Sequence, residues 1–125
     1  MPIDATLPYD PTNIFAKILR GEIKCNRVYE DDHALAFHDI APQAAVHILV
    51  IPKGAYVSWD DFSARASDAE IAGFVRAAGH VAREQGLVAL GYRLLAHVGE
   101  NGGQEVPHLH IHLFGGVPLG PMLAR

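Results

Sequence analysis

Three histidines, at positions 108, 110 and 112, stand in the segment "PHLHIHLFGG", and a single aliphatic residue separates each from the next. Successive side chains of a β-strand point to opposite faces. A strand here would therefore align the three imidazoles on one face and turn Leu109 and Ile111 toward a core. A neutral imidazole can attack phosphorus or a carbonyl carbon when neighbours fix its tautomer and a proton donor serves the leaving group. The row of His108, His110 and His112 therefore predicts a nucleophilic site.

Two other interpretations of the histidine row remain open. A solvated strand face that is rich in histidine requires no chemistry. A zinc site is also conceivable, because imidazole suits zinc and His47 or His97 would complete a tetrahedral set. The sequence adds no Cys/His pair and no obvious carboxylate at the spacing of zinc ligands, so catalysis is the favoured interpretation.

The segment "ENGGQEV", directly before the histidine row, favours an anion site. Gly102 and Gly103 allow backbone N–H groups to approach a phosphate closely, and Gln104 would add a side-chain donor toward a bridging oxygen. The same glycines would also serve in a hairpin turn. Beside three aligned histidines they support the catalytic interpretation.

Hydrophobic periodicity predicts the elements that must position these groups. Thr12 would cap the first helix, while Ser67 and Glu70 have capping-box spacing at the start of the second, which ends at Gly86. The expected helices cover residues 13–21 and 67–86, and the expected strands cover 26–31, 33–40, 46–52, 91–98 and 107–115. This order predicts an α+β domain: an antiparallel five-stranded sheet with one long and one short helix.

The composition excludes several classes of protein. The chain has 125 residues, 50% of them hydrophobic and 19% charged, which is typical of a single folded domain. Its net charge of -4, without a Lys/Arg cluster, predicts no nucleic-acid partner and no membrane partner. The single cysteine, Cys25, excludes an intramolecular disulfide, the N-terminus lacks a signal-peptide pattern, and no apolar run reaches the ~20 residues of a membrane span. A cytoplasmic location is expected.

Four segments together resemble the histidine triad (HIT) hydrolases, and within them the Hint branch of purine nucleoside phosphoramidases. They are "IFAKILRGEI", "ALAFHDIAPQAAVHILVIPK", "GYRLL" and "GGQEVPHLHIHLFGG". The resemblance covers residues 13–116, so residues 1–125 are expected to form a single HIT domain with a short N-terminal arm and a C-terminal tail. It implies hydrolysis of AMP-type purine nucleoside phosphoramidates and related adenylates through a nucleotidyl-histidine intermediate. It also implies a homodimer, and it implies no metal and no cofactor. The small residues Ala77, Ala78 and Gly79 of the long helix would either allow close helix approach in such a dimer or pack on the sheet.

The resemblance assigns roles to the histidines. His110, the middle residue of the motif, is similar to the family's nucleophile. His108 and His112 are then its supporting neighbours, which orient the imidazole and contact the phosphate. His47 matches an upstream histidine that would extend the polar network to His108 or His110.

The resemblance also implies a nucleotide site. Asp39 in "FHDI" matches a ribose-binding acidic residue, and His38 precedes it. The apolar walls around the purine would be Ile14, Phe15, Ile18, Ile23, Phe37 and Ile40. The phosphate would be contacted by His97, Gly103, Gln104, Glu105 and Val106.

Three positions depart from the family pattern. His97 stands where the Hint branch usually has asparagine, Glu105 stands where some relatives have serine, and the C-terminus "VPLGPMLAR" lacks a tryptophan. Two other functions therefore remain as alternatives. They are a dinucleoside polyphosphate hydrolase of another HIT branch and a non-catalytic nucleotide-binding protein.

Overall fold

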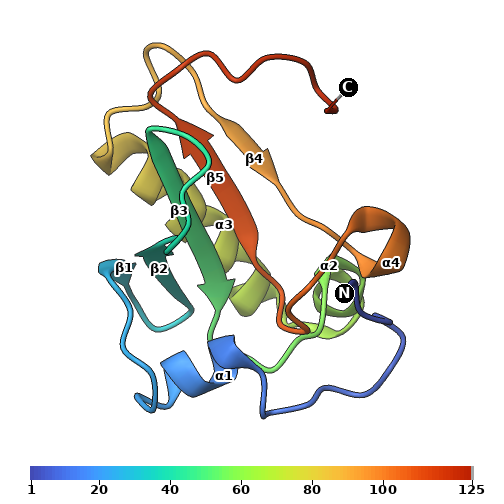
Figure 1. The fold of residues 1–125 in the computed structure, drawn as a ribbon. Coiled ribbons are helices and arrows are strands. Elements are labelled where there is room, and N and C mark those ends of the chain that lie inside the picture. Colours follow the sequence, from blue (N-terminus) through green and yellow to red (C-terminus); the bar gives the residue numbers. More distant parts are fainter. Residues whose placement is uncertain (125) are drawn as a thin grey trace.

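The computed structural model describes residues 1–124, which form one antiparallel sheet with helices around it (Figure 1). The elements follow one another as α1 (Ile14–Leu19), β1 (Arg27–Glu30), β2 (Ala34–His38), β3 (Val46–Pro52), α2 (Trp59–Arg65), α3 (Asp68–Glu84), β4 (Arg93–Leu95), α4 (Gly99–Gly102) and β5 (Ile111–Gly115). The strand order across the sheet is β1-β2-β3-β5-β4. The predicted α+β class and the antiparallel five-stranded sheet are confirmed. Within residues 1–124, no helix has the length and apolarity to cross a bilayer.

Two interior strands, β2 and β3, are apolar at nearly every position because both faces of the sheet are covered. On one face lies α3 (Figure 1). It packs against a cluster that includes Ala36 and Val50. On the other face, α1 contributes Phe15 to a smaller cluster with Leu35 and Leu49. Alternate residues of the same strands thus serve two different cores.

The long helix α3 begins as its sequence predicts. The Ser67 hydroxyl accepts from the Glu70 N–H at 3.1 Å, and the Glu70 carboxylate accepts from the Ser67 N–H at 3.1 Å, which confirms the capping box. The helix ends at Glu84, and Gly86 follows with a φ of 69° that favours glycine. Ala77 and Ala78 are buried against the sheet within the monomer, so they are not free for the helix–helix approach considered above.

The start of α1 differs from the prediction. Its N-cap is Asn13, whose side-chain oxygen accepts from the Ala16 N–H at 2.9 Å. The hydroxyl of Thr12 donates instead to Asp10 at 2.7 Å, in the turn that precedes the helix. Thr12 and Asn13 are both good capping residues, and the local turn decided between them.

The expectation of only two helices is wrong, because α2 and α4 are also present. The N-cap of α2 is Ser58, whose hydroxyl accepts from the Asp61 N–H at 3.3 Å. With seven residues in α2 and four in α4, neither helix is long enough to show a clear hydrophobic period. α4 occupies part of the glycine-rich segment that was also considered for a hairpin turn. It ends at Gly102, and Gly103 follows as its C-cap with a φ of 77°.

The last two strands are shorter than expected. The segment 91–98 is a strand only at Arg93–Leu95, and the segment 107–115 is a strand only from Ile111 onward. Leu109 donates its N–H to the Tyr56 carbonyl at 2.8 Å, so this part of the histidine segment is bonded to a loop. The histidine row therefore begins outside the sheet.

Phe74→Ala should lower the free energy of unfolding by about 3–5 kcal/mol, because Phe74 of α3 is fully buried and the surrounding core cannot collapse into the space it leaves. Urea denaturation measures the effect. Val75→Ala on the same helix is the control, because Val75 is 56% exposed and should change stability by less than about 1 kcal/mol. Equal losses for the two variants would contradict the assigned face of α3.

Candidate active site

The histidine row lies at the start of β5, and only His112 belongs to the strand. Leu109 and Ile111 are buried in the core beneath α3, as the alternation predicts. His108 and His110 are also buried, and the ring centroids of His110 and His112 lie 5.1 Å apart. Alternation thus separates imidazoles from aliphatic side chains although the strand itself is short.

His110 is held in one tautomer by the backbone carbonyl of His108. Its Nδ1 lies 2.8 Å from the carbonyl oxygen of His108, and a carbonyl can only accept, so the proton is on Nδ1. The Nε2 of His110 therefore carries a lone pair. Burial lowers the pKa of His110, which keeps the ring neutral near pH 7. The Phe15 ring meets it edge-on, with centroids 4.9 Å apart.

His108 has both ring nitrogens occupied. Its Nε2 donates to the Pro52 carbonyl at 2.9 Å, so its Nδ1 accepts from the hydroxyl of Tyr9 at 2.6 Å. Burial lowers the pKa of His108 to about 4, so this ring is also neutral. Tyr9 was not among the predicted site residues, because a tyrosine 99 positions away in the chain carries no local signal.

A second pair of histidines, His47 and His112, lies beside the first. The Nδ1 of His47 accepts from the Gln43 N–H at 3.1 Å, which puts its proton on Nε2. That Nε2 lies 2.9 Å from the Nδ1 of His112 and 3.5 Å from a carboxylate oxygen of Asp39. His47 therefore donates to His112, whose own proton is then on Nε2.

The polar network of His47 thus differs from the prediction, which joined it to His108 or His110. His47 is on β3 and faces Phe114 of β5 in the register of the sheet, so His112 is the imidazole within its reach. Burial lowers the pKa of His47, and the nearby Asp39 carboxylate opposes this shift. Burial, followed by the neighbouring imidazoles, lowers the pKa of His112 to about 4.

A cavity of about 250 Å³ opens beside these rings. Eight of the predicted site residues line it: Phe15, Asp39, His97, Gly103, Glu105, Val106, His110 and His112. Gln43 and Leu49 also line it and were not predicted, since neither belongs to a pattern of chemical groups. A second cavity, of about 450 Å³, shares Gln43, His97 and His112 with the first and extends under the C-terminal tail.

His97 lies in this site although β4 ends before it. Its ring is edge-on to that of His112, with centroids 5.2 Å apart, and it lines both cavities. The predicted position of His97 facing the pocket agrees with this geometry.

Gln104 does not offer a donor to the cavity. Its two amide hydrogens are donated to the carbonyls of Val57 at 2.7 Å and Val106 at 3.0 Å, and its oxygen accepts from the Gly99 N–H. It is 1% exposed. The side chain therefore holds the loop before the histidine row in place, contrary to the expected contact with a bridging oxygen.

The glycine-rich loop also uses its first N–H groups internally. Those of Gly103 and Gln104 donate to the carbonyls of Glu100 and Gly99, each at 3.0 Å, and close α4. Among the loop residues that line the cavity, Glu105 and Val106 have N–H groups for which no hydrogen bond is found within residues 1–124, so these two could serve an anion.

The remaining predicted residues lie outside the cavity lining. Ile18 and Phe37 are buried in the core cluster next to α1. Ile14, Ile23 and Ile40 are exposed, at 43%, 36% and 98%. His38 ends β2 and is half-buried.

Asp39, His47 and His112 form the one group in residues 1–124 with ligand atoms close enough for a metal ion, all within 4.8 Å of one another. Two imidazole nitrogens on a tetrahedral zinc would lie about 3.3 Å apart, given Zn–N distances of about 2.0 Å. Here the two nitrogens are 2.9 Å apart and share a proton, and the other nitrogen of His47 is also bonded. The donor set fits a proton relay better than a cation.

The fold and the site together define an α+β domain with a histidine cluster on one face of an antiparallel sheet, next to a small polar cavity. The family model of the HIT domain matches residues 20–119 of this chain. The chain belongs to the HIT domain family.

Individual relatives agree with this assignment. A 13.2 kDa HIT-like protein of Azospirillum brasilense is 66% identical over 117 residues, which cover 94% of this chain and 96% of the relative. Purine nucleoside phosphoramidase of Escherichia coli K12 is 47% identical over 112 residues, covering 90% and 93%. Among solved structures, a HIT family hydrolase from Clostridium thermocellum has a TM-score of 0.81 at 38% identity, covering 90% and 97%.

Proposed function

We propose that this protein hydrolyses purine nucleoside phosphoramidates and related adenylates, and that it does so through a nucleotidyl intermediate on His110. The observation that carries the proposal is the tautomer of His110: its Nδ1 proton is donated to the His108 carbonyl, which leaves a lone pair on Nε2 in a ring that lines the cavity. The name and the 47% identity of the Escherichia coli relative support the same reaction. We also propose that the present protein is located in the cytoplasm, where a lone thiol such as Cys25 stays reduced.

The first step forms a bond between the Nε2 of His110 and phosphorus and breaks the P–N bond. The negative charge of the entering phosphate favours protonation of a nearby imidazole. His112 is hydrogen-bonded to His47, which lies 3.5 Å from the Asp39 carboxylate. This series of groups, from Asp39 through His47 to His112, is suited to stabilise the added proton. The added proton belongs to the His47–His112 pair: His112 passes its Nε2 proton to the departing nitrogen while its Nδ1 takes the Nε2 proton of His47, so the amine leaves neutral and the pair returns to its neutral charge.

The second step returns the enzyme to its starting state. Water attacks phosphorus, the bond to His110 breaks, and the now neutral His112 takes the proton that the water loses. A nucleoside monophosphate is released. His108 and its carbonyl keep the Nδ1 proton of His110 in place through both steps.

The surroundings of the cavity support a nucleotide with its phosphate at His110. Asp39 lines the cavity and offers a carboxylate oxygen to the ribose hydroxyls. The exposed Ile14, Ile23 and Ile40, together with the half-buried His38 and the buried Ile18 and Phe37, are proposed to receive the purine. Glu105 and Val106 supply N–H groups to the phosphate, and the amine extends into the second cavity beside His97.

His110→Ala should lower kcat to below about a thousandth of the wild-type value with folding intact, because the lost group is the nucleophile. The assay measures release of AMP from an adenosine phosphoramidate, with diadenosine polyphosphate as a parallel substrate. His80→Ala is the control, because His80 lies on the outer part of α3 and should leave kcat unchanged.

The assay also separates the alternatives. Activity of His110→Ala above a tenth of wild type would contradict the nucleophile assignment. A preference of the wild type for the diadenosine substrate would indicate another HIT branch. Binding of AMP without turnover of either substrate would indicate a nucleotide-binding protein.

His97→Asn should preserve or raise kcat/KM at neutral pH, because an amide donates at every pH and a neutral imidazole has only one N–H. The measurement is kcat/KM against pH for both proteins. Superimposable profiles would remove His97 from the site, and a large loss at every pH would show dependence on the imidazole.

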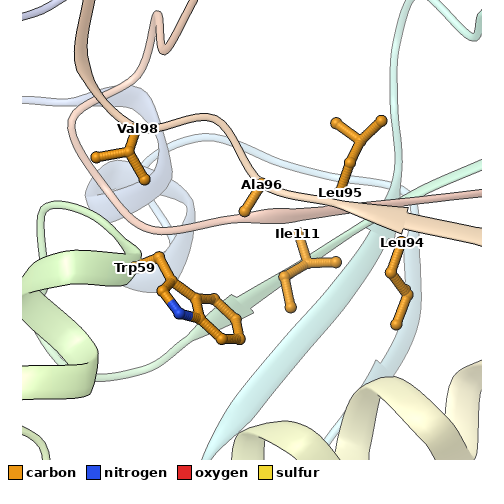
Figure 2. Close-up of a pocket in the computed structure, with 6 residues that line it drawn as sticks. All are labelled: Trp59, Leu94, Leu95, Ala96, Val98 and Ile111. Carbon is orange, nitrogen blue, oxygen red and sulfur yellow. The ribbon is translucent and has the colours of Figure 1, made fainter. Parts of the chain in front are cut away.

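We further propose that the protein is a homodimer that pairs along β4. β4 is one of the two outer strands of the sheet, and an edge strand presents N–H and C=O groups to a second strand. Beside it, Trp59, Leu94 and Val98 line an open apolar pocket of about 380 Å³. Figure 2 shows these side chains. All three side chains are at least 40% exposed, and a second copy of β4 would cover them.

Leu94→Glu should convert the dimer into a monomer, because a buried interface cannot accept an unpaired carboxylate. Sedimentation velocity measures the mass at several concentrations. Leu90→Glu is the matched control, since Leu90 is fully exposed and lies outside the pocket. A wild type that sediments as a monomer, or a Leu94→Glu variant that stays dimeric, would contradict pairing at β4.

A further inference from the structure

The N-terminal arm, residues 3–13, lies against the histidine row. Ile3 donates its N–H to the Gln104 carbonyl at 2.7 Å, and Tyr9 places its hydroxyl 2.6 Å from the Nδ1 of His108. Figure 1 shows the blue N-terminal segment running from near α2 and α4 to α1, at the end of the sheet where β5 begins. The arm therefore touches the loop before the row and the row itself.

We propose that Tyr9 is a positioning residue of the reaction: its hydroxyl fixes the tautomer and place of His108, and through the His108 carbonyl it fixes the nucleophile His110. The expected effect of Tyr9 on the reaction rate rests on the proposed function. The hydrogen bond from Tyr9 to His108 does not. The family model of the HIT domain matches residues 20–119, so Tyr9 lies outside the matched segment. Its hydroxyl is a group that the N-terminal arm contributes to the site.

The need for Tyr9 follows from the burial of His108, whose side chain has no exposed surface. Its Nε2–H is donated to the Pro52 carbonyl, so the Nδ1 must accept or remain a buried acceptor without a partner. The other tautomer would place a lone pair against that carbonyl. The Tyr9 ring also packs edge-on against the imidazole, with centroids 5.6 Å apart.

The phenol is suited to donate throughout the working pH range. Burial raises the pKa of Tyr9 above its ordinary value, so the hydroxyl keeps its proton. Because His108 is neutral, its Nδ1 is a permanent acceptor for this proton. The bond does not depend on a change of charge in either group.

The arm holds Tyr9 in place through short local turns. Asp10 accepts from both the N–H and the hydroxyl of Thr12, at 2.9 and 2.7 Å, and Asn13 then caps α1. Two residues further on, Phe15 packs against His110. Residues 9–15 thus contact both histidines of the reacting unit, with Tyr9 on His108 and Phe15 on His110.

The carbonyl of His108 connects the two histidines. It accepts the Nδ1 proton of His110 at 2.8 Å, so a shift of residue 108 moves the nucleophile as well. A displacement of about 1 Å at a reacting atom is enough to lower a rate strongly. The nucleotide pocket itself does not include Tyr9, so substrate affinity should be affected less than kcat.

The test is Tyr9→Phe, which keeps the ring and removes the hydroxyl. We expect kcat to fall about three- to thirtyfold with KM within about twofold of wild type, as the loss of one buried hydrogen bond near the reacting group predicts. Nitrogen NMR of ¹⁵N-histidine-labelled protein should show the His108 Nδ1 signal moving toward that of an unbonded acceptor. Tyr92→Phe is the matched control, because Tyr92 is 38% exposed and should change neither measurement.

The outcomes separate this inference from the proposed function. An unchanged His108 signal in Tyr9→Phe, or a kcat within twofold of wild type, overturns the positioning role. A lower melting temperature with unchanged kcat also overturns it, because it assigns Tyr9 to stability alone. If the wild type does not hydrolyse the phosphoramidate, the proposed function fails, while the His108 signal still reports whether the Tyr9 bond exists.

Discussion

The hydrogen bond from the Nδ1 of His110 to the carbonyl of His108 is the constraint on which the site depends. It fixes which ring nitrogen bears the lone pair, and it requires residues 108–110 to hold a backbone path outside the sheet. The surrounding chain supports this path. Leu109 is bonded to the Tyr56 carbonyl, and the buried amide of Gln104 ties the adjacent Val57 to the loop before the row. The loop before α2 and the glycine-rich segment are thus parts of the support for one imidazole.

The sheet, which is covered on both faces, provides the low-polarity surroundings that the proposed chemistry would use. Along β2 and β3, alternate residues serve the core beneath α3 and the smaller cluster beneath α1. Phe15 and Leu49 of the smaller cluster also line the cavity, so part of the hydrophobic core is the wall of the site. The same burial lowers the pKa values of His108 and His112 to about 4 and keeps the rings neutral. The same packing therefore stabilises the fold and keeps the imidazoles in the neutral form that the proposed reaction requires.

The sequence predicts the features that repeat over short distances. The alternation at His110 and His112 and the capping box at Ser67 are local patterns, and both agree with the structure. Contacts between distant segments were not predictable in this way. The choice of His112 as the partner of His47 follows from the register of β3 and β5, and the Tyr9 contact joins residues 99 positions apart. Short helices such as α2 and α4 are intermediate between local patterns and distant contacts. Their sequences contain capping residues, but the helices are too short to show a hydrophobic period.

The charges around the cavity explain how such a site can bind a phosphate and still release its product. Within the described chain, no lysine or arginine lines the cavity, while Asp39 and the exposed Glu105 add negative charge. Arg93, in the second cavity, donates to the carbonyls of Gly120 and Pro121 in the tail. In the proposed reaction, a phosphate would be met by N–H groups and by imidazoles, and the bound anion would favour protonation of an imidazole. The proton recruited in this way would be the one that the leaving amine needs, so attraction of the substrate and protonation of the leaving group would be one event.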